Sequence, residues 1–415
     1  MQVYDYIVAG AGSAGCAVAA RLTESGRFSV LLLEAGPSDR RFWVQTPIGY
    51  GKCFYDPRVN WMYETEPVPG LAGRPSYWPR GRVLGGSSSI NAMVYSRGQP
   101  QDFDGWEAIG NSGWGWKEVL PIYKKMEDHA LGAGPYHGAG GPLHVTTIEK
   151  LAHPLTYAFM EAGKEVGLPF NPDLNGASSE GVGFYQVTTR EGFRFSAARA
   201  YLWPARRRCN LRVLTGALAH RILFDGARAV GISYQRRGLV EEARAGREVI
   251  LAAGAINSPQ LLQLSGIGPA ALLRAHAIPV IRDCDEVGAN LQDHLCYDHV
   301  YRASRRTLNE DLHPWHGKMR AGLQYVLTRR GPLSMSLNQG GGFFRSRPEA
   351  VSPDIQLYFS PLTYEKAPPR TRPLMNPDSF PGFCTSVSPC RPKSRGFVRI
   401  RSSDPRIAPE IHPNY

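Results

Sequence analysis

Three glycines and one glutamate near the start of the chain have the types and spacing that bind a dinucleotide. Gly10, Gly12 and Gly15 follow a short apolar run with the spacing G-x-G-x-x-G, and Glu34 closes the next apolar run. The first glycine permits a tight turn, the second lets the backbone approach a pyrophosphate, and the third lets a helix pack closely on a strand. A carboxylate at the place of Glu34 accepts hydrogen bonds from a ribose diol and repels a 2′-phosphate.

The elements that position these residues form a strand–helix–strand unit. Residues 6–9 are apolar, as expected of a buried parallel strand, and residues 29–33 predict the second strand. Residues 13–25 predict a helix that Gly26 ends, and the N-terminus of this helix directs free N–H groups toward an anion. The sequence therefore predicts a dinucleotide site, although the motif alone leaves both FAD and NAD open. The alternative is an ordinary strand–helix–strand unit in which the glycines only pack.

A second glycine-rich segment occupies residues 79–91, Pro-Arg-Gly-Arg-Val-Leu-Gly-Gly-Ser-Ser-Ser-Ile-Asn. Gly85 and Gly86, followed by three serines, give a backbone that can lie against a flat or charged ligand and that offers N–H and O–H donors. The flanking apolar residues favour a ligand cradle over a flexible surface loop. Ser87 lacks the G-x-S-x-G context of a hydrolase nucleophile.

These motifs resemble those of the glucose–methanol–choline (GMC) oxidoreductases. Residues 81–98 resemble the first signature of that family, residues 254–268 resemble the second, and residues 287–294 are similar to a third block. They follow the N-terminal glycine fingerprint in the order found in the family, and the resemblance covers the chain almost continuously. Within the family, the chain is similar to the choline-dehydrogenase-like and related alcohol dehydrogenases.

The resemblance implies FAD and assigns residues to it. The first glycine cluster would bind the pyrophosphate, Glu34 the adenosine ribose, residues 82–86 the flavin side and residues 91–94 the isoalloxazine ring. Some relatives carry a histidine in place of Asn91 and bond it covalently to the flavin. An amide cannot form that bond, so we expect non-covalent FAD. The cofactor-binding residues implied in this way are Gly10, Gly12, Ser13, Ala14, Gly15, Glu34, Ala35, Arg82, Val83, Gly85, Gly86, Asn91, Ala92, Met93, Val94, Ala219, Ala253 and Gly254.

The resemblance also implies a reaction. A base removes the hydroxyl proton of an alcohol while the carbon-bound hydrogen passes as a hydride to the flavin, which gives an aldehyde or ketone. Choline, another primary alcohol or a polyol is the expected substrate, and oxygen, a quinone or a carrier is the expected electron acceptor. NAD-dependent dehydrogenation is disfavoured by the two later signatures.

No catalytic residue is assigned. The proton-abstracting histidine of the family lies in a C-terminal segment that the sequence, which ends at Tyr415, does not contain. His294 and His299 are candidates by residue type only, and a structural role is favoured for His294. Because a positioned general base contributes about 10² to 10⁴ in rate, we expect a truncated or interrupted gene, or a frame error. The alternative function is accordingly a catalytically inactive FAD-binding remnant.

The order of the elements predicts an α/β protein, α+β overall, with two discontinuous domains. Residues 1–155 and 205–296 are expected to form a Rossmann-like FAD-binding domain with a parallel sheet and a small antiparallel meander. Residues 156–204 and 297–415 are expected to form a substrate domain with a mostly antiparallel sheet.

Three details of this prediction concern single segments. In the meander, residues 239–243 are expected to form the last strand, because glycine-containing turns separate the alternating runs before it. Residues 248–252 are then expected to return to the parallel sheet as a separate strand. Gly340–Gly342 is expected to be a turn.

Composition excludes several classes of protein. The 415 residues carry a formal net charge of +12, with 42% hydrophobic and 20% charged residues, which is typical of a soluble globular protein. The arginine clusters are dispersed and lack interleaved aromatic residues, so we expect no nucleic-acid partner. Seven scattered cysteines without a C-x-x-C pair predict no metal site. No run is long enough for a membrane span, and no secretory signal precedes the first strand, so a cytoplasmic protein is expected.

Overall fold

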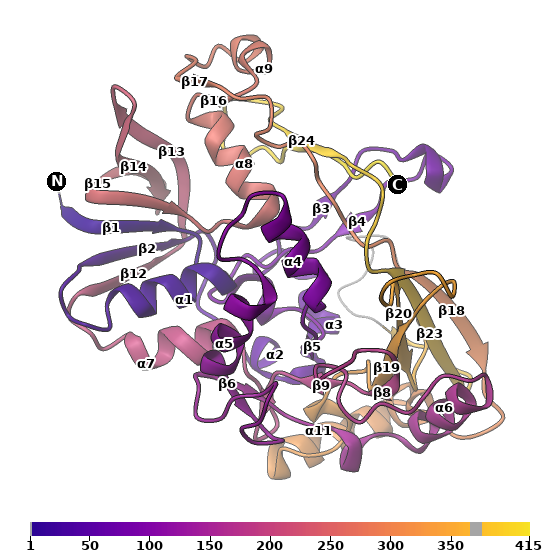
Figure 1. Cartoon of the computed structure of the whole chain (residues 1–415). Coiled ribbons are helices and arrows are strands. Elements are labelled where there is room, and N and C mark those ends of the chain that lie inside the picture. The colour runs from indigo at the N-terminus through magenta and orange to yellow at the C-terminus, as the bar shows by residue number, and fades with distance from the viewer. Residues whose placement is uncertain (1, 366–375) are drawn as a thin grey trace.

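Two β-sheets organise the molecule, one on each side in the view of Figure 1. The computed structural model describes residues 2–365 and 376–415. The larger sheet has six strands in the order β12-β2-β1-β15-β14-β13. Its strands are β1 (Val3–Ala9), β2 (Val30–Glu34), β12 (Leu211–Thr215), β13 (Ala217–Asp225), β14 (Arg228–Arg236) and β15 (Leu239–Leu251).

The parallel half of this sheet is built from apolar runs that are buried on both faces. β1 pairs in parallel with β2 and β15, and β12 pairs in parallel with β2. α1 (Ser13–Leu22) connects β1 to β2 and packs on one face through Cys16 and Ala19, whereas Ile7 and Leu31 belong to the core of the other face. The carboxyl ends of β1, β2 and β15 therefore meet at one edge, which is where open α/β sheets bind ligands.

The last strand of the meander differs from the prediction in its length. The two strands expected at residues 239–243 and 248–252 are one strand, β15. Its first half pairs antiparallel with β14 and its second half pairs in parallel with β1, and the register with β1 shifts between Tyr4 and Tyr6. The Rossmann-like sheet and its meander nevertheless confirm the predicted fold class.

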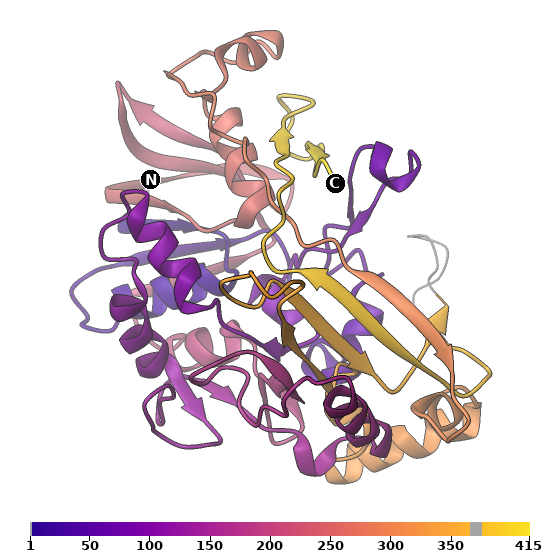
Figure 2. The same ribbon diagram turned by 45° about the vertical axis from the view of Figure 1, so that its right-hand side comes forward.

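The smaller sheet is antiparallel throughout, with the strand order β18-β23-β20-β19. Figure 2 brings this sheet forward and shows α6 (Pro154–Glu165) and α11 (Trp315–Thr328) lying below it. The segments that separate its strands along the chain are rich in proline. The strands are β18 (Tyr297–Arg302), β19 (Gly340–Phe344), β20 (Ile355–Ser360) and β23 (Gly382–Pro389).

The turn predicted at Gly340–Gly342 is wrong, because these glycines begin strand β19. They are required by close packing rather than by a turn. A Cβ at Gly341 would lie 2.1 Å from the carbonyl oxygen of Leu357, and one at Gly342 would lie 1.9 Å from the carbonyl oxygen of Gly181. Glycine is the sequence signal both for a turn and for close contact between strands, so local sequence does not distinguish the two.

The remaining elements are short and form the connections around the two sheets. The helices are α2 (Phe42–Gln45), α3 (Tyr50–Cys53), α4 (Pro100–Ala108), α5 (Trp116–Met126), α7 (Trp203–Ala205), α8 (Gly254–Leu264), α9 (Ala270–Ala275) and α10 (Leu308–Leu312). Paired short strands are β3 (Tyr63–Glu64) with β4 (Tyr77–Trp78), β5 (Val94–Tyr95) with β9 (Gln186–Val187), β6 (Glu127–His129) with β7 (Leu143–Val145), β10 (Thr189–Arg190) with β11 (Phe193–Arg194), β16 (Ile267–Gly268) with β17 (Arg282–Asp283), β21 (Tyr364–Glu365) with β22 (Asn376–Pro377), and β24 (Phe397–Arg399) with β25 (Glu410–His412); β8 (Gly181–Phe184) lies against β19.

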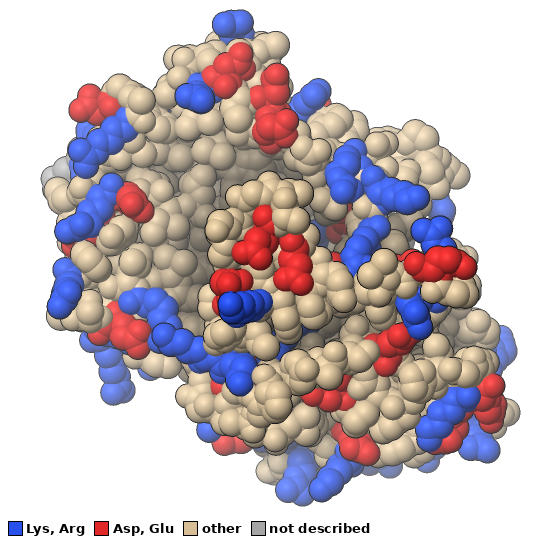
Figure 3. Space-filling view, viewed as in Figure 1, with Lys and Arg blue, Asp and Glu red and all other residues tan. Residues whose placement is uncertain are grey.

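The surface carries charges of both signs. In the view of Figure 1, basic and acidic side chains are interspersed, and an acidic group sits at the centre of this face (Figure 3). In the part of the chain that the structure describes, no helix combines the length and apolarity needed to cross a bilayer.

Candidate functional site

The turn after β1 is shaped by two glycines that leave no room for a side chain. Gly10 has φ +100° and donates its N–H to the carbonyl oxygen of Leu33 at 2.9 Å. A Cβ at Gly15 would lie 1.9 Å from the carbonyl oxygen of Gly10. Gly12 differs, because its Cβ position is open except for one carbonyl oxygen at 3.8 Å. The outer two glycines therefore close the turn, and the middle one leaves space beside the helix.

The N-terminus of α1 is left uncapped beside this space. Gly12 is the N-cap residue, no side chain accepts a hydrogen bond there, and the first turn contains no acidic residue. The first N–H groups of a helix lack partners within the helix and carry the positive end of its dipole. A phosphate group fits such an end, in agreement with the predicted pyrophosphate site.

The second glycine segment is in direct contact with the first. Gly85 donates its N–H to the carbonyl oxygen of Ala11 at 2.7 Å, and both Gly85 and Gly86 have positive φ. A Cβ at Gly86 would lie 2.7 Å from the Cα of Gly12. Two segments that lie more than 70 residues apart in the sequence thus form one backbone cradle.

Glu34 is held at the end of β2 by two backbone donors. Its Oε2 accepts the N–H of Ala11 at 3.0 Å, and its Oε1 accepts the N–H of Gly36 at 2.8 Å. Burial raises the pKa of Glu34 to about 7, although these two hydrogen bonds and the charge of Arg82 oppose the shift. Each oxygen keeps further capacity as an acceptor, as recognition of a ribose diol requires.

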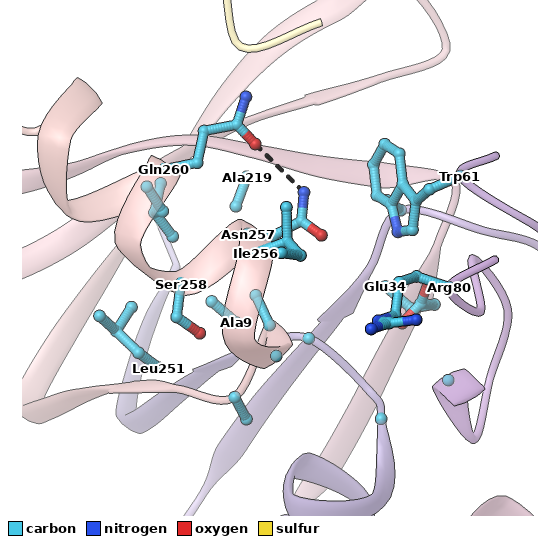
Figure 4. A pocket seen from close by; sticks show the side chains of 18 of the residues that line it. Ala9, Glu34, Trp61, Arg80, Ala219, Leu251, Ile256, Asn257, Ser258 and Gln260 are labelled. Atoms are coloured by element: carbon cyan, nitrogen blue, oxygen red, sulfur yellow. Dashed lines mark hydrogen bonds between the residues drawn. The ribbon is translucent and has the colours of Figure 1, made fainter. Parts of the chain in front are cut away.

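These elements enclose a cavity of about 490 Å³, within the range of ligand sites. In Figure 4, Glu34, Trp61 and Arg80 lie on one side of it, across from Asn257 and Gln260 of α8. Asn257 donates to Gln260 Oε1 at 3.1 Å, which fixes the two amides against each other. The predicted residues that line the cavity are Gly10, Gly12, Ser13, Ala14, Glu34, Ala35, Gly86, Ala219, Ala253 and Gly254.

The other predicted residues lie outside this lining. Gly15 and Gly85 support the cradle from behind through the contacts given above, and Val83 is buried in a core cluster with Val44. Arg82 lines a second cavity next to the β2 end. Residues 91–94 lie beyond the serine-rich turn and lead into β5.

Residues 91–94 are fixed by a buried cation. Arg194 is 1% exposed, and its Nη1 donates to Asn91 Oδ1 at 2.9 Å. Asn91 Oδ1 also accepts the N–H of Met93 at 3.0 Å. Met93 is buried and has φ +62°, a conformation that non-glycine residues adopt at a cost and that often marks a functional segment.

A buried charged network supports β5 from the other side. Tyr95 and Arg97 both donate to Glu127, and His137 lies between Glu127 and Asp173 at 3.3 and 2.8 Å. Burial alone would lower the pKa of His137, but the two carboxylates raise it to about 9, so the ring is cationic at neutral pH. The pKa of Glu127 lies well below its ordinary value because burial is outweighed by these donors.

Sequence reasoning missed several residues of the cavity wall. Trp61, Arg80 and the polar face of α8 line the cavity but were assigned no contact with the cofactor, although Arg80 lies within the predicted ligand cradle at residues 79–91. The proline and glycine around Arg80 were the available signal. His294 and His299 are exposed and do not line the cavity.

Comparison with known proteins identifies this architecture. The family model of the GMC oxidoreductases matches residues 4–296. The chain belongs to the GMC oxidoreductase family. Mouse mitochondrial choline dehydrogenase is 43% identical over 99% of this chain and 69% of its own length. The alcohol dehydrogenase [acceptor] of Pseudomonas putida is 42% identical over 100% of this chain and 74% of its own length. The pyridoxine 4-oxidase structure from Mesorbium loti has a TM-score of 0.85 at 32% sequence identity, and the match covers 99% of this chain and 76% of that one.

Family membership confirms the predicted activity class. As a GMC oxidoreductase, the protein is an FAD-dependent oxidoreductase of alcohols. The cradle meets the demands of that cofactor: an uncapped helix N-terminus for the pyrophosphate, an open Cβ position at Gly12, and the acceptor oxygens of Glu34. The residues present therefore fit FAD.

Proposed function

We propose that the protein oxidises a primary alcohol, choline-like or related, with FAD held non-covalently in the cradle between the two glycine segments. The observation that carries this proposal is the direct contact of Gly85 and Gly86 with Ala11 and Gly12. It supports a single site shared by the N-terminal glycine fingerprint and the first family signature. The names of the relatives given above support the substrate class.

Within this proposal, each part of the cradle has a physical task. The N–H groups of Gly12, Ser13 and Ala14 bind the pyrophosphate, and Glu34 accepts hydrogen bonds from the ribose. Ala219 and the Ala253–Gly254 backbone border the adenine end. Bound FAD supplies the acceptor for the hydride.

The flavin end of the proposed site is bordered by Asn91–Val94. Arg194 holds this segment in place and brings a positive charge close behind it, with no carboxylate partner among the described residues. Val83 packs in one buried cluster with Ile90, the residue that precedes this segment. The proposed domain division at residues 155, 205 and 296 would then separate this cofactor unit from the antiparallel sheet, which would border the alcohol.

Anaerobic spectroscopy tests the proposed reaction. Adding choline, a primary aliphatic alcohol or a polyol to the flavin-loaded protein is expected to bleach the flavin absorbance with at least one of them, because hydride transfer reduces the flavin. A secondary or tertiary amine without a hydroxyl group is the control. Stoichiometric FAD that no alcohol reduces would contradict the proposed activity and favour a non-catalytic flavoprotein.

Release of the cofactor tests the mode of attachment. Because Asn91 is an amide and cannot form a histidyl bond, acid or heat precipitation is expected to leave all of the flavin in the supernatant. Absorbance of the pellet redissolved in denaturant measures what remains attached. Flavin that stays with the denatured polypeptide would overturn non-covalent binding.

Substituting Glu34 tests the ribose contact and its pH dependence. In Glu34→Gln, the amide NH₂ group would face the N–H of Ala11 or Gly36 and leave one donor unpaired, so the FAD dissociation constant should rise at least about tenfold. In the native protein, FAD affinity should fall as pH drops below about 7, because a protonated carboxyl loses one acceptor. Fluorescence titration of FAD from pH 5.5 to 8.5 measures both effects.

The same carboxyl affects the stability of the cofactor-free protein with a defined sign. The pKa of Glu34 in the folded protein lies above its ordinary value of 4.5, so the folded state binds the proton more tightly than the unfolded state. The free energy of unfolding should therefore fall as pH rises from about 4.5 to about 7, and this part of the slope should vanish in Glu34→Gln. Glu24→Gln, at an exposed position, is the matched control, and an identical slope in Glu34→Gln and native protein would contradict the assignment.

A further inference from the structure

A second cavity, which is open to the surface and has a volume of about 720 Å³, borders the turn that follows Glu34 at the end of β2. Among the described residues, its lining has only Ala35 in common with that of the cofactor cavity, and it contains no acidic and no aromatic side chain. Five arginines border it, together with the turn that follows β2 and the turn between β12 and β13. The lining residues are Ala35, Gly36, Pro37, Arg41, Pro57, Arg58, Arg82, Thr215, Gly216, Arg236 and Arg237.

Four of these arginines have no carboxylate partner in the described part of the chain. Arg58 is the exception, because its Nη2 lies 2.8 Å from Asp56 Oδ2. Arg236 donates to a backbone carbonyl oxygen at 3.4 Å, and the guanidinium carbon of Arg82 lies 5.0 Å from the ring centre of Trp61. The Nε of Arg82 is buried and has no acceptor.

This arrangement is unfavourable unless an anion is present. Guanidinium groups around one cavity repel each other, and a buried donor without an acceptor has lost its hydration. The same groups, which come from four separate chain segments, are suited to a multivalent anion, because a guanidinium fork binds phosphate oxygens in pairs.

Packed backbone separates this cavity from the cofactor cradle. Gly36 donates its N–H to Glu34 on one side, and its carbonyl oxygen accepts the N–H of Gly216 at 2.9 Å. A Cβ at Gly36 would lie 1.9 Å from the carbonyl oxygen of Arg82, so the wall contains no opening at this point. The two cavities are neighbours, and Ala35 lines both of them.

We propose that this second cavity is a binding site for a compact polyphosphate group. The volume exceeds what a single phosphate ion needs, and the positive charge is distributed around the cavity rather than gathered at one point. The absence of an aromatic side chain from the described lining provides no surface for stacking a base. Recognition is therefore directed at the phosphates, whether they are free as pyrophosphate or carried by a nucleoside.

Calorimetric titration of the FAD-loaded protein with inorganic pyrophosphate tests this site, at constant ionic strength because exposed charges are screened by salt. We expect saturable binding of one pyrophosphate per chain. Arg237→Gln and Arg41→Gln should each raise the dissociation constant at least about tenfold, the effect of losing one charge-assisted hydrogen bond. Arg237 is exposed at a hairpin turn, so its replacement leaves the fold intact.

Two controls make the outcome decisive. Arg207→Gln removes the same charge at an exposed position outside the cavity and should leave the dissociation constant unchanged. A second titration with ADP distinguishes the source of the phosphates: equal affinity indicates the pyrophosphate group alone, and tighter binding indicates a nucleotide. Absence of saturable binding, an equal effect of Arg207→Gln, or binding that disappears when FAD is loaded would each overturn the proposal.

Discussion

Replacing Gly15 by alanine is expected to abolish FAD binding and to destabilise the fold. The new Cβ would lie 1.9 Å from the carbonyl oxygen of Gly10 and 3.0 Å from its carbonyl carbon. Gly10 cannot retreat, because its own Cβ position is already 2.6 Å from the carbonyl oxygen of Ala252 and its N–H is bonded to Leu33. α1 must therefore move away from β1, which should cost about 1–3 kcal/mol of overpacking and displace the helix N-terminus.

Helix propensity alone predicts that Gly15→Ala stabilises the protein, so a loss of stability would show that close packing outweighs propensity at this position. Alanine is favoured over glycine inside a helix by about 1 kcal/mol. Gly105 in α4 is the matched control, because its Cβ position has nothing within 4 Å. Gly105→Ala should stabilise slightly and bind FAD normally, whereas Gly15→Ala should raise the FAD dissociation constant at least about a hundredfold. Normal FAD affinity in Gly15→Ala, measured by flavin fluorescence, would contradict the cradle geometry.

Replacing Arg194 by methionine is expected to lower the free energy of unfolding by several kcal/mol, because it removes a buried, hydrogen-bonded guanidinium group. The side chain donates to the carbonyl oxygens of Val44, Ser88 and Pro47 and to Asn91 Oδ1. Burial lowers the pKa of Arg194 to about 10, so the guanidinium is still charged at neutral pH. Removing it takes the guanidinium donor from the carbonyl oxygens of Val44, Ser88 and Pro47, at about 1–3 kcal/mol for each group that stays buried without a partner, whereas Asn91 Oδ1 keeps the N–H of Met93.

Loss of Arg194 should also weaken the binding of FAD. The serine-rich turn and the segment after it would lose the bonds that fix Ser88 and Asn91, so FAD affinity should fall together with the urea midpoint. Arg194→Lys should recover only part of the loss, since one ammonium cannot span four acceptors. Arg27→Met, at an exposed position, should stay within about 0.5 kcal/mol of the native protein. A urea midpoint in Arg194→Met equal to that of the control would refute this role.

Local sequence patterns predicted the strands and helices whose burial is visible in the order of their own residues. The strands predicted at residues 6–9 and 29–33 and the helix predicted to begin at residue 13 correspond to β1, β2 and α1, because apolar runs and helical spacing report burial directly. The glycine fingerprint follows β1 and Glu34 ends β2, as the predicted strand–helix–strand unit requires, because one continuous unit sets their spacing.

Features that depend on distant segments were not accessible in this way. Gly340–Gly342 looked like a turn because nothing nearby in the sequence reveals that Leu357 and Gly181 approach it. Arg194 gave no signal of its four hydrogen bonds, since its acceptors come from two other parts of the chain, residues 44–47 and 88–91. The second, arginine-lined cavity likewise forms only when the β2 end and the β14 hairpin meet.

A crystal structure of the protein grown with FAD is the most direct test of the proposed cradle. The pyrophosphate should lie between the N-terminus of α1 and Gly86, with the ribose at Glu34 and the isoalloxazine ring beside residues 91–94. An adenosine diphosphate group outside this cavity, or one bound among the arginines of the second cavity, would contradict it.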